Sequence, residues 1–424
     1  MPPLNNTTTS STNTCTQAVK YLESACNLVK STTSTTTALF PCTLKYTSYL
    51  KQKHQLTDEG ESSIASAPGV FPEPKIGCCA DPVRPVRLYN PATGESEVIS
   101  GNDARIIISE ESDRGYLIED VLRKAIYGQV NKGHVLEFNL STGAWEMTCT
   151  SCAIKALDWR SVRENSRSRR RKDEDPLTEI AAMQYYRDQL RGSKATNVMT
   201  SVEVLRDDAT LYIIMPFCKD GELFDRVEAT VSGFHEDEAR HWMKQLTRGI
   251  QSLHDVGICH RDLSLENVLV HNGTCQIIDF GMCLRMPEAD IVQGDKRPLV
   301  TPQGSCGKLF YMSPEVYNNR EAFDGEAIDV WSAGVMLFMM LIGSPAYGKP
   351  DPSDDCFAWI TTGRLPHLLK SWGVSLSLEA VDLMEGMLCV DPKRRLTLRQ
   401  VMNHPWFKMA DRNSNVPPPP ASAE

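Results

Sequence analysis

The sequence of 424 residues contains no long uninterrupted run of apolar residues. A helix needs about 20 predominantly apolar residues to cross a bilayer, so we expect no membrane-spanning segment and no membrane partner. The first residues, Met-Pro-Pro-Leu-Asn-Asn, also lack the basic stretch and apolar core of a secretory signal peptide. By default, these absences predict a cytoplasmic protein, with the nucleus as the alternative compartment.

The sequence also has no excess of positive charge. Lys and Arg number 45 against 54 Asp and Glu, which gives a formal net charge of −9. Proteins that bind nucleic acid usually present a basic face, so we expect no nucleic-acid partner. The one strongly basic stretch, residues 167–172, must lie in water because its cations repel one another. A solvated loop and a nuclear-targeting or docking segment are both compatible with it.

The 14 cysteines do not form the paired pattern of a zinc site. Cys149 and Cys152 make one C-x-x-C pair, but no second pair follows at a suitable spacing. We therefore expect reduced thiols in an intracellular protein rather than a metal centre or a disulfide framework.

Hydrophobic periodicity is missing from the first hundred residues. Ser and Thr dominate residues 7–14 and 31–37, and Pro, Gly and Ser are frequent in residues 38–100. Such segments bury too little apolar surface to offset the entropy of ordering. We predict a largely disordered extension over residues 1–114 and a short proline-containing tail over residues 409–424.

Regular patterns begin near residue 115. Alternating residues predict a few strands around one helix, and helices are expected to dominate from residue 236 onward. Apolar residues at spacings of three and four predict the first of them, 236–253, and a nearly all-apolar segment predicts a buried helix over 327–341. The expected strands are 135–140, 145–155, 202–205 and 211–215, and the expected helices are 177–190, 236–253, 327–341, 378–388 and 398–404. The chain is therefore expected to fold as an α+β protein.

One segment carries a chemical signature. Asp262 and Asn267 lie five residues apart, and Asp279-Phe280-Gly281 follows twelve residues after Asn267. Phosphoryl transfer needs such groups, a base for the incoming hydroxyl and oxygen ligands for magnesium. With Ser-Pro-Glu at 313–315, this set resembles the eukaryotic protein kinase family over roughly residues 115–408.

The resemblance implies a bilobal protein-kinase-like fold, with a small β-rich lobe at about 115–215 and a larger helical lobe at about 216–408. It implies transfer of the γ-phosphoryl group of ATP, with Mg²⁺, to hydroxyls of protein substrates. Serine and threonine are favoured because residues 263–266 do not match the tyrosine-kinase pattern. Residues 220–226 resemble the calcium/calmodulin-dependent group, by analogy alone.

In the family pattern, Asp262 accepts or orients the substrate hydroxyl, while Asn267 and Asp279 hold magnesium. Lys155 matches the lysine on the third strand that holds the α- and β-phosphates. A buried ammonium is costly unless it is paired. Glu179 is the expected partner, because the other nearby acids precede Pro176 and thus the helix.

The glycine-rich loop is matched less well. Gly128, Gly133 and Val135 fit G-x-G-x-x-G-x-V, but Val130 stands where the middle glycine belongs. Glycine lets the backbone approach phosphates closely, so Val130 predicts weaker nucleotide affinity. The resemblance further implies that Val135 and Ala153 cap the adenine ring.

The expected hinge between the lobes is residues 211–218. Met215 would guard the back of the nucleotide pocket, and Cys218 would make the main backbone contact to adenine. Glu222 matches the position that faces the ribose or a basic substrate residue. The alternative for Glu222 is an acid favoured at a helix start by the dipole.

Two positions depart from the serine/threonine-kinase pattern. Ser264 replaces the lysine that contacts the γ-phosphate, and Lys308 replaces a threonine that bonds the catalytic aspartate. We hypothesise that the Lys308 ammonium takes over the missing charge; otherwise it faces solvent. Together with Val130, these departures leave a second interpretation, a weak or inactive pseudokinase that serves as a nucleotide-binding scaffold.

The remaining motifs concern regulation and scaffolding. Thr301 and Ser305 are candidate phosphorylation sites, and a phosphate there could dock on Arg261. The family pattern also pairs Glu315 with Arg395 and uses a helix carboxylate, here Asp329, to anchor the backbone of the catalytic loop.

Overall fold

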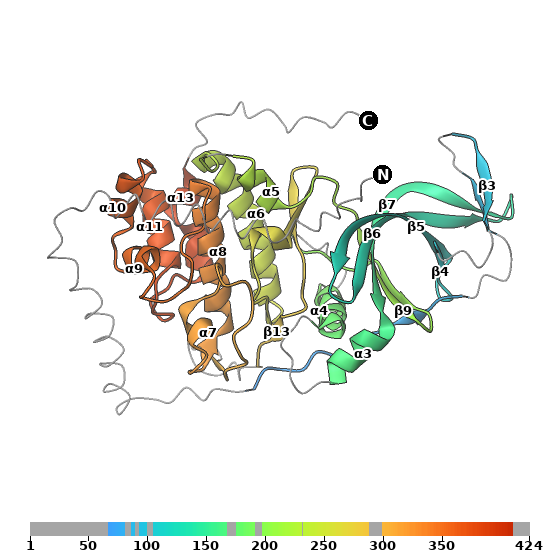
Figure 1. Cartoon of the computed structure of the whole chain (residues 1–424), viewed down its shortest axis with the longest axis horizontal. Coiled ribbons are helices and arrows are strands. Elements are labelled where there is room, and N and C mark those ends of the chain that lie inside the picture. Colours follow the sequence, from blue (N-terminus) through green and yellow to red (C-terminus); the bar gives the residue numbers. More distant parts are fainter. Residues whose placement is uncertain are drawn as a thin grey trace, which may run out of the picture.

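The computed structural model describes residues 67–80, 86–89, 93–99, 105–167, 175–190, 197–230, 232–287 and 299–409. These residues form two lobes, a curled β-sheet with two helices at one end and a mainly helical body at the other (Figure 1). The predicted bilobal α+β fold is therefore confirmed.

The small lobe is built on a nine-stranded sheet in the order β1-β8-β9-β7-β6-β5-β4, with β2 joined to β7 and β3. The long antiparallel strands β5, β6 and β7 form its centre. The strands are β1 (Gly77–Cys78), β2 (Val86–Tyr89), β3 (Ser96–Ile99), β4 (Ile106–Ile108), β5 (Arg114–Ala125), β6 (Gly128–Asn139), β7 (Ala144–Asp158), β8 (Glu203–Arg206) and β9 (Thr210–Pro216).

The two faces of β7 carry different side chains because strand residues alternate in direction. Cys152 and Ile154 are buried in the core of the sheet. Ala153, Lys155 and Leu157 point to the other face, where they line the cavity between the lobes. Strand alternation thus brings Lys155 to the interlobe side.

The small lobe begins before residue 115. Strands β1 to β4 lie within the stretch predicted to be disordered, and β1 pairs in parallel with β8 while β4 pairs antiparallel with β5. The prediction is corrected for these segments, which satisfy the hydrogen-bonding groups of the sheet edges. Strands of two to four residues are too short to show a periodic pattern. Residues 1–66 and 410–424 lie outside the described residues.

Two helices flank the sheet, α3 (Trp159–Arg167) and α4 (Pro176–Gln189). Helix α4 corresponds to the predicted helix and is capped by Asp175, whose side chain accepts a hydrogen bond from the Leu177 backbone. Helix α3 was not predicted. It is anchored by Val162, which is fully buried, and by Trp159, whose ring contacts the guanidinium of Arg206. The basic residues 168–172 lie outside the described residues.

The large lobe surrounds the buried helix α8 (Gly325–Ile342), against which α6 (Glu236–His254) packs. Helix α8 is apolar and long enough to cross a membrane, but 94% of it is buried inside the protein, as expected for a core helix. The other elements are α5 (Leu223–Glu228), β10 (Ile258–Cys259), the 3-10 helix η1 (Leu265–Asn267), β11 (Val268–His271), β12 (Thr274–Ile277), β13 (Leu284–Arg285), β14 (Leu299–Val300), α7 (Pro314–Asn318), β15 (Phe323–Asp324), α9 (Asp355–Thr361), α10 (Leu365–Ser371), α11 (Leu378–Met387), α12 (Leu398–Asn403) and α13 (Pro405–Lys408).

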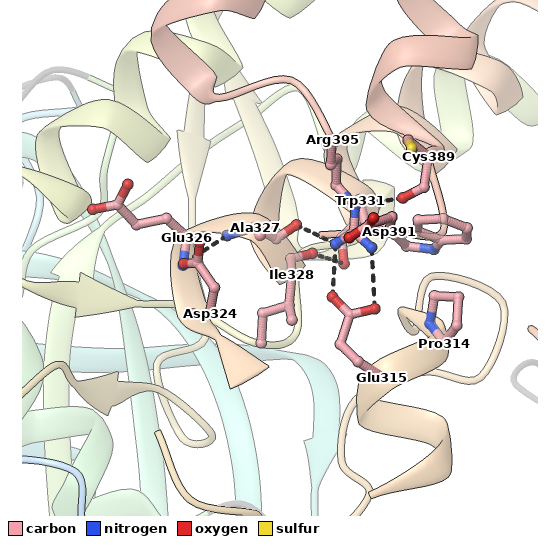
Figure 2. A network of polar contacts seen from close by, with 12 residues as sticks. Pro314, Glu315, Asp324, Glu326, Ala327, Ile328, Trp331, Cys389, Asp391 and Arg395 are labelled. Carbon is pink, nitrogen blue, oxygen red and sulfur yellow. Dashed lines mark hydrogen bonds and ion pairs between the residues drawn. The ribbon is translucent and has the colours of Figure 1, made fainter. Parts of the chain in front are cut away.

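A buried arginine joins three parts of this lobe (Figure 2). Arg395 donates from both terminal nitrogens to Glu315, at 2.7 and 3.1 Å, and also to the carbonyl oxygens of Ala327 and Cys389. Its guanidinium lies 5.0 Å from the centre of the Trp331 ring. The predicted Glu315–Arg395 pair is confirmed, and it ties α7 to α8 and to the loop before α12.

Removing this arginine should destabilise the large lobe. Arg395→Ala leaves the Glu315 carboxylate partly buried without its partner, which costs about 3–5 kcal/mol. Chemical denaturation should show a clearly lower unfolding midpoint. The matched control is Arg394→Ala, which removes the exposed neighbouring arginine; equal midpoints for the two variants would contradict the assigned role.

Candidate active site

A cavity of about 520 Å³ lies between the two lobes. The small lobe contributes β5, β6, β7 and α4, whereas the large lobe contributes residues after β9 and the segment Ile278–Phe280. Of the predicted site residues, Ala153, Lys155, Glu179 and Asp279 line it together with Met215, Cys218 and Glu222. Residues from widely separated parts of the chain therefore converge on one cleft.

A buried ion pair lines the interlobe cavity. Nζ of Lys155 on β7 lies 2.6 Å from Oε2 of Glu179 on α4, the partner that the sequence predicted. Burial raises the pKa of Glu179, and Asp279 raises it further, while Lys155 lowers it. Since both charges are largely withdrawn from water, each depends on the other, and the pair fixes α4 relative to the sheet.

The side chain of Asp262 is held by hydrogen bonds to both of its oxygens. The amide nitrogen of Asn267 donates to Oδ2 at 3.0 Å and to the Asp262 carbonyl at 2.8 Å, while the Lys308 backbone N–H donates to Oδ1 at 2.9 Å. The Asn267 amide nitrogen is thus directed to Asp262, and its amide oxygen is left for another partner. The Asn267 amide therefore fixes the orientation of the Asp262 carboxylate.

The loop that carries Asp262 is anchored by the side chain of Asp329 on α8. This carboxylate accepts hydrogen bonds of 2.9 Å from the backbone N–H groups of His260 and Arg261 and from the His254 ring. Burial alone would raise the pKa of Asp329, but the hydrogen bonds from His254 and the His260 backbone outweigh it and lower the pKa. The predicted anchor role of this helix carboxylate is confirmed.

Two site residues adopt backbone conformations that are unusual for residues other than glycine. Arg261 has φ of 67° and Asp279 has φ of 70°, both in the left-handed region. Such conformations cost about 1–3 kcal/mol each and persist where the surroundings enforce them. At Arg261 the enforcing contact is the Asp329 carboxylate, which fixes its N–H.

Lys308 points toward the catalytic loop. Its Nζ donates to Oγ of Ser264 at 2.7 Å and lies 3.8 Å from Oδ2 of Asp262. The lysine that the family pattern would have at position 264 is thus replaced by a serine in direct contact with a lysine from another segment. The ammonium therefore stands beside Asp262, with about a third of the side chain exposed.

The glycine-rich loop is corrected by the structure. Residues 128–139 form the continuous strand β6, and the tight turn into it is Ile126-Tyr127. Gly128 and Gly133 are required by close strand packing, because a Cβ would lie 2.0 Å from the Ala156 oxygen and 2.4 Å from the Leu117 oxygen respectively. Neither glycine lines the cleft.

Val135 is also misplaced by the sequence interpretation. It lines a second groove, on the other side of the hinge, instead of the interlobe cavity. In register, Val130 pairs with Lys155 on β7, and Val130 is the β6 residue that lines the cleft. The glycine spacing suggested that Val135 lies above the nucleotide site, but the pairing of β6 with β7 places Val130 there. Val130 and Ala153 are therefore the apolar side chains that these two strands present to the interlobe cavity.

The cleft mouth contains an ion pair that the sequence did not reveal. Nη1 of Arg123, near the end of β5, donates to Oε1 of Glu222, just before α5, at 3.1 Å. Burial raises the pKa of Glu222, and Arg123 opposes this effect. Glu222 also caps α5 with Asp225 in a reciprocal capping box, so both sequence interpretations of this residue retain support.

The candidate phosphorylation sites lie near the end of the segment that follows Asp279. Oγ of Ser305 donates to the carbonyl oxygens of Val316 and Tyr317, so its hydroxyl is turned toward α7. Oγ1 of Thr301 accepts a hydrogen bond from Gln303. Residues 288–298 lie outside the described residues, and phosphorylation at Thr301 or Ser305 stays a prediction.

The oxygen atoms of the cleft suit a magnesium ion that arrives with a phosphorylated ligand. Within the described ranges, no three His, Cys, Asp or Glu side chains cluster as a self-sufficient metal site. Mg²⁺ is usually bound through one or two protein carboxylates together with substrate phosphates and water. The Asp279 carboxylate and the Asn267 amide oxygen fit this limited donor set.

Comparison with known proteins supports this picture. The model of the protein kinase domain matches residues 141–407. Serine/threonine-protein kinase SAPK7 of Oryza sativa subsp. japonica is 35% identical over 222 residues, 51% of this chain and 58% of the relative. SRK2G of Arabidopsis thaliana is 34% identical over 223 residues, 51% and 59% of the two chains, and DCLK3 of Mus musculus is 33% identical over 214 residues, 50% and 26%. The matched part thus spans less than two thirds of these relatives.

The thiol of Cys218 should react slowly with alkylating reagents at neutral pH. Burial, with Asp220 nearby, raises the pKa of Cys218 to about 11. The thiolate is the reactive form, so at about pH 8 its population should be about a hundredfold below that of an ordinary thiol.

Mass spectrometry of iodoacetamide-treated protein can follow this reaction, with the exposed Cys149 as internal control. The Cys218 rate should rise about tenfold per pH unit from about pH 8 to about pH 10. A Cys218 rate equal to that of Cys149 at neutral pH would contradict the assigned environment.

Proposed function

The chain belongs to the protein kinase family, and from this premise we propose that it transfers the γ-phosphoryl group of ATP to serine or threonine hydroxyls of protein substrates. The observation that carries the proposal is the arrangement of five predicted residues. Lys155, Glu179 and Asp279 line the interlobe cavity, and the hydrogen-bonded pair Asp262–Asn267 is joined to the Asp279 segment by a 2.9 Å hydrogen bond from the Ile278 N–H to the Asn267 carbonyl. Family members use ATP and magnesium in general; the assignment of individual ligands in this chain is part of the proposal.

Asp262 is the proposed base. Its carboxylate accepts or orients the proton of the substrate hydroxyl as that oxygen forms its bond to the γ-phosphorus and the bond to the β-phosphate breaks. The hydrogen bonds from Asn267 and from the Lys308 backbone support this role because they fix both carboxylate oxygens before substrate arrives. Preorganised polar groups lower the cost of reorganisation during the reaction.

Lys155, Asn267 and Asp279 are the proposed nucleotide and metal ligands. The Lys155 ammonium, oriented by Glu179, would bind the α- and β-phosphates, while the oxygens of Asn267 and Asp279 would hold magnesium. Bound magnesium supplies neutralisation of charge on the phosphates. Ala153 and Val130 offer an apolar surface for the adenine ring, and Met215 and Cys218 line the same cavity at the hinge.

Lys308 is proposed as a relocated catalytic cation. Its contact with Ser264 at 2.7 Å supports the view that its ammonium occupies the region served by the lysine at position 264 in the family pattern. The distance of 3.8 Å places this charge beside Asp262, the proposed base, where the phosphoryl group would be transferred. A cation placed there stabilises negative charge that develops on the phosphoryl oxygens.

The pseudokinase alternative was based on Val130, Ser264 and Lys308. Val130 no longer supports it, because this residue lines the cleft from strand β6 and does not stand at a glycine position of a phosphate loop. The contact between Lys308 and Ser264 weakens the remaining argument, and the similar proteins named above are serine/threonine kinases. The placement in the calcium/calmodulin-dependent group is not confirmed and stays a prediction. A cytoplasmic location, with the nucleus as alternative, remains part of the proposal, supported by the cysteines of the described residues, none of which forms a disulfide.

Phosphate transfer should depend on Asp262 and Asp279. With radiolabelled ATP, Mg²⁺ and a generic basic protein, Asp262→Asn and Asp279→Ala should each lower the transfer rate by at least about a hundredfold, since they remove the base and a metal ligand. Asp208→Ala, at an exposed turn, is the matched control and should transfer normally. Nucleotide binding without transfer that depends on Asp279 would favour the scaffold alternative.

The relocated cation can be tested by moving it back. Lys308→Met should lower kcat about tenfold to a hundredfold, because one charge beside the transferred group is lost. The double variant Ser264→Lys with Lys308→Met should recover much of this loss, while the exposed Lys393→Met should change nothing. Unchanged turnover in Lys308→Met, with Lys155→Met inactive, would show that Lys308 has no catalytic role.

A further inference from the structure

We propose that residues 69–79 are a built-in positioning segment that holds α4, and with it Glu179, against Lys155. The inference rests on the kinase activity proposed above and concerns residues that precede the matched kinase domain. In Figure 1 this segment, coloured blue, runs from the side of β13 past α4 toward the sheet. Three sets of contacts support it, one at each end and one on α4.

The first end is fixed to the strand that follows Asp279. The Gly69 N–H donates to the Arg285 carbonyl at 2.8 Å, and Nη1 of Arg285 donates to the Val70 carbonyl at 2.9 Å. Glycine suits this position because a Cβ would lie 3.2 Å from Cγ of Arg285 and 3.3 Å from the Met286 oxygen. The segment thus begins on β13, in the large lobe.

The middle of the segment crosses α4. The Lys75 N–H donates to Oε1 of Gln184 at 2.8 Å, and Nε2 of Gln184 donates back to the Lys75 carbonyl at 2.7 Å. The Phe71 ring meets Tyr185 edge-on at 5.8 Å, and the same tyrosine contacts the Arg285 guanidinium at 5.0 Å. Both polar groups of one amide side chain are therefore committed to a segment more than a hundred residues away.

The far end is fixed to the edge of the sheet. β1 (Gly77–Cys78) pairs in parallel with β8, and the Cys79 N–H donates to the Arg206 carbonyl at 2.9 Å. Pro72 and Pro74 lie between the two attached ends and restrict the backbone. A short, stiff chain anchored on β13 and on β8 leaves α4 little freedom to move away from the sheet.

The position of α4 matters because Glu179 lies on it. Gln184 follows Glu179 by five residues, about 7.5 Å along the helix axis. The start of α4 is tied separately, through the Asp175 N–H to the Gly281 carbonyl at 3.2 Å. Segment 69–79 thus restrains the later turns, and a displacement of about 1 Å in a catalytic group can cost about a hundredfold in rate.

The test replaces Gln184 in the full chain. Gln184→Met keeps the length and helix propensity of the side chain but removes both hydrogen bonds to Lys75, whereas Gln184→Glu keeps the acceptor for the Lys75 N–H. Gln189→Met, on the exposed side of the same helix, is the matched control. Amide hydrogen exchange over residues 176–189 reports on α4 independently of activity, and kcat and KM are measured for transfer from ATP.

Gln184→Met should speed exchange in α4 and lower kcat about fivefold to tenfold, with Gln184→Glu intermediate and Gln189→Met like the wild type. The KM for the protein substrate should not change, because α4 lies in the small lobe. Unchanged exchange in Gln184→Met would overturn the inference, as would faster exchange with an unchanged kcat. A wild type without any transfer would overturn the proposed function, and the exchange data would still decide whether the segment holds α4.

Discussion

The Lys155–Glu179 ion pair is the constraint on which the site depends. One charge comes from strand β7 and the other from helix α4, and at 2.6 Å in a largely dry environment each charge stabilises the other. Asp279 adds a third charge nearby and favours the protonated form of Glu179. A nucleotide phosphate and its cation would therefore enter a site where one ammonium already lies near two carboxylates.

The large lobe positions the Asp262 carboxylate, the proposed base. Asp329, rooted in the buried helix α8, fixes the backbone of the loop, and Asn267 with Lys308 fixes the side chain of Asp262. The buried helix α8 thus fixes the position of the loop that carries Asp262. Lys308 contributes twice, because its backbone N–H donates to Asp262 and its ammonium donates to Ser264.

The sequence predicted most of the chemistry because those residues occur in dense local motifs. Asp262, Asn267 and Asp279 follow from their spacing, and the position of Pro176 favours Glu179. The Glu315–Arg395 pair follows from the resemblance to the kinase family. Amphipathic periodicity predicted α6, and a nearly all-apolar segment predicted α8. Helix α3 was missed because its nine residues are mostly charged or polar, with Trp159 and Val162 as its apolar residues.

What the sequence could not provide depends on long-range pairing. Strands β1 to β4 are too short for alternation to be visible, and the Arg123–Glu222 pair forms only through the register of β5. The glycines of β6 were misinterpreted because glycine serves close strand packing as well as phosphate loops, and only the pairing with Leu117 and Ala156 distinguishes the two.

A crystal structure with a non-hydrolysable ATP analogue and Mg²⁺ tests the central claim most directly. The account predicts β- and γ-phosphates in the interlobe cavity, the Lys155 ammonium on the phosphates, and a metal within about 2.1 Å of oxygens of Asp279 and Asn267. It also predicts the Lys308 ammonium next to the γ-phosphate. An analogue bound outside the cavity, or bound there with its phosphates directed away from Lys155 and Asp279, would contradict the account.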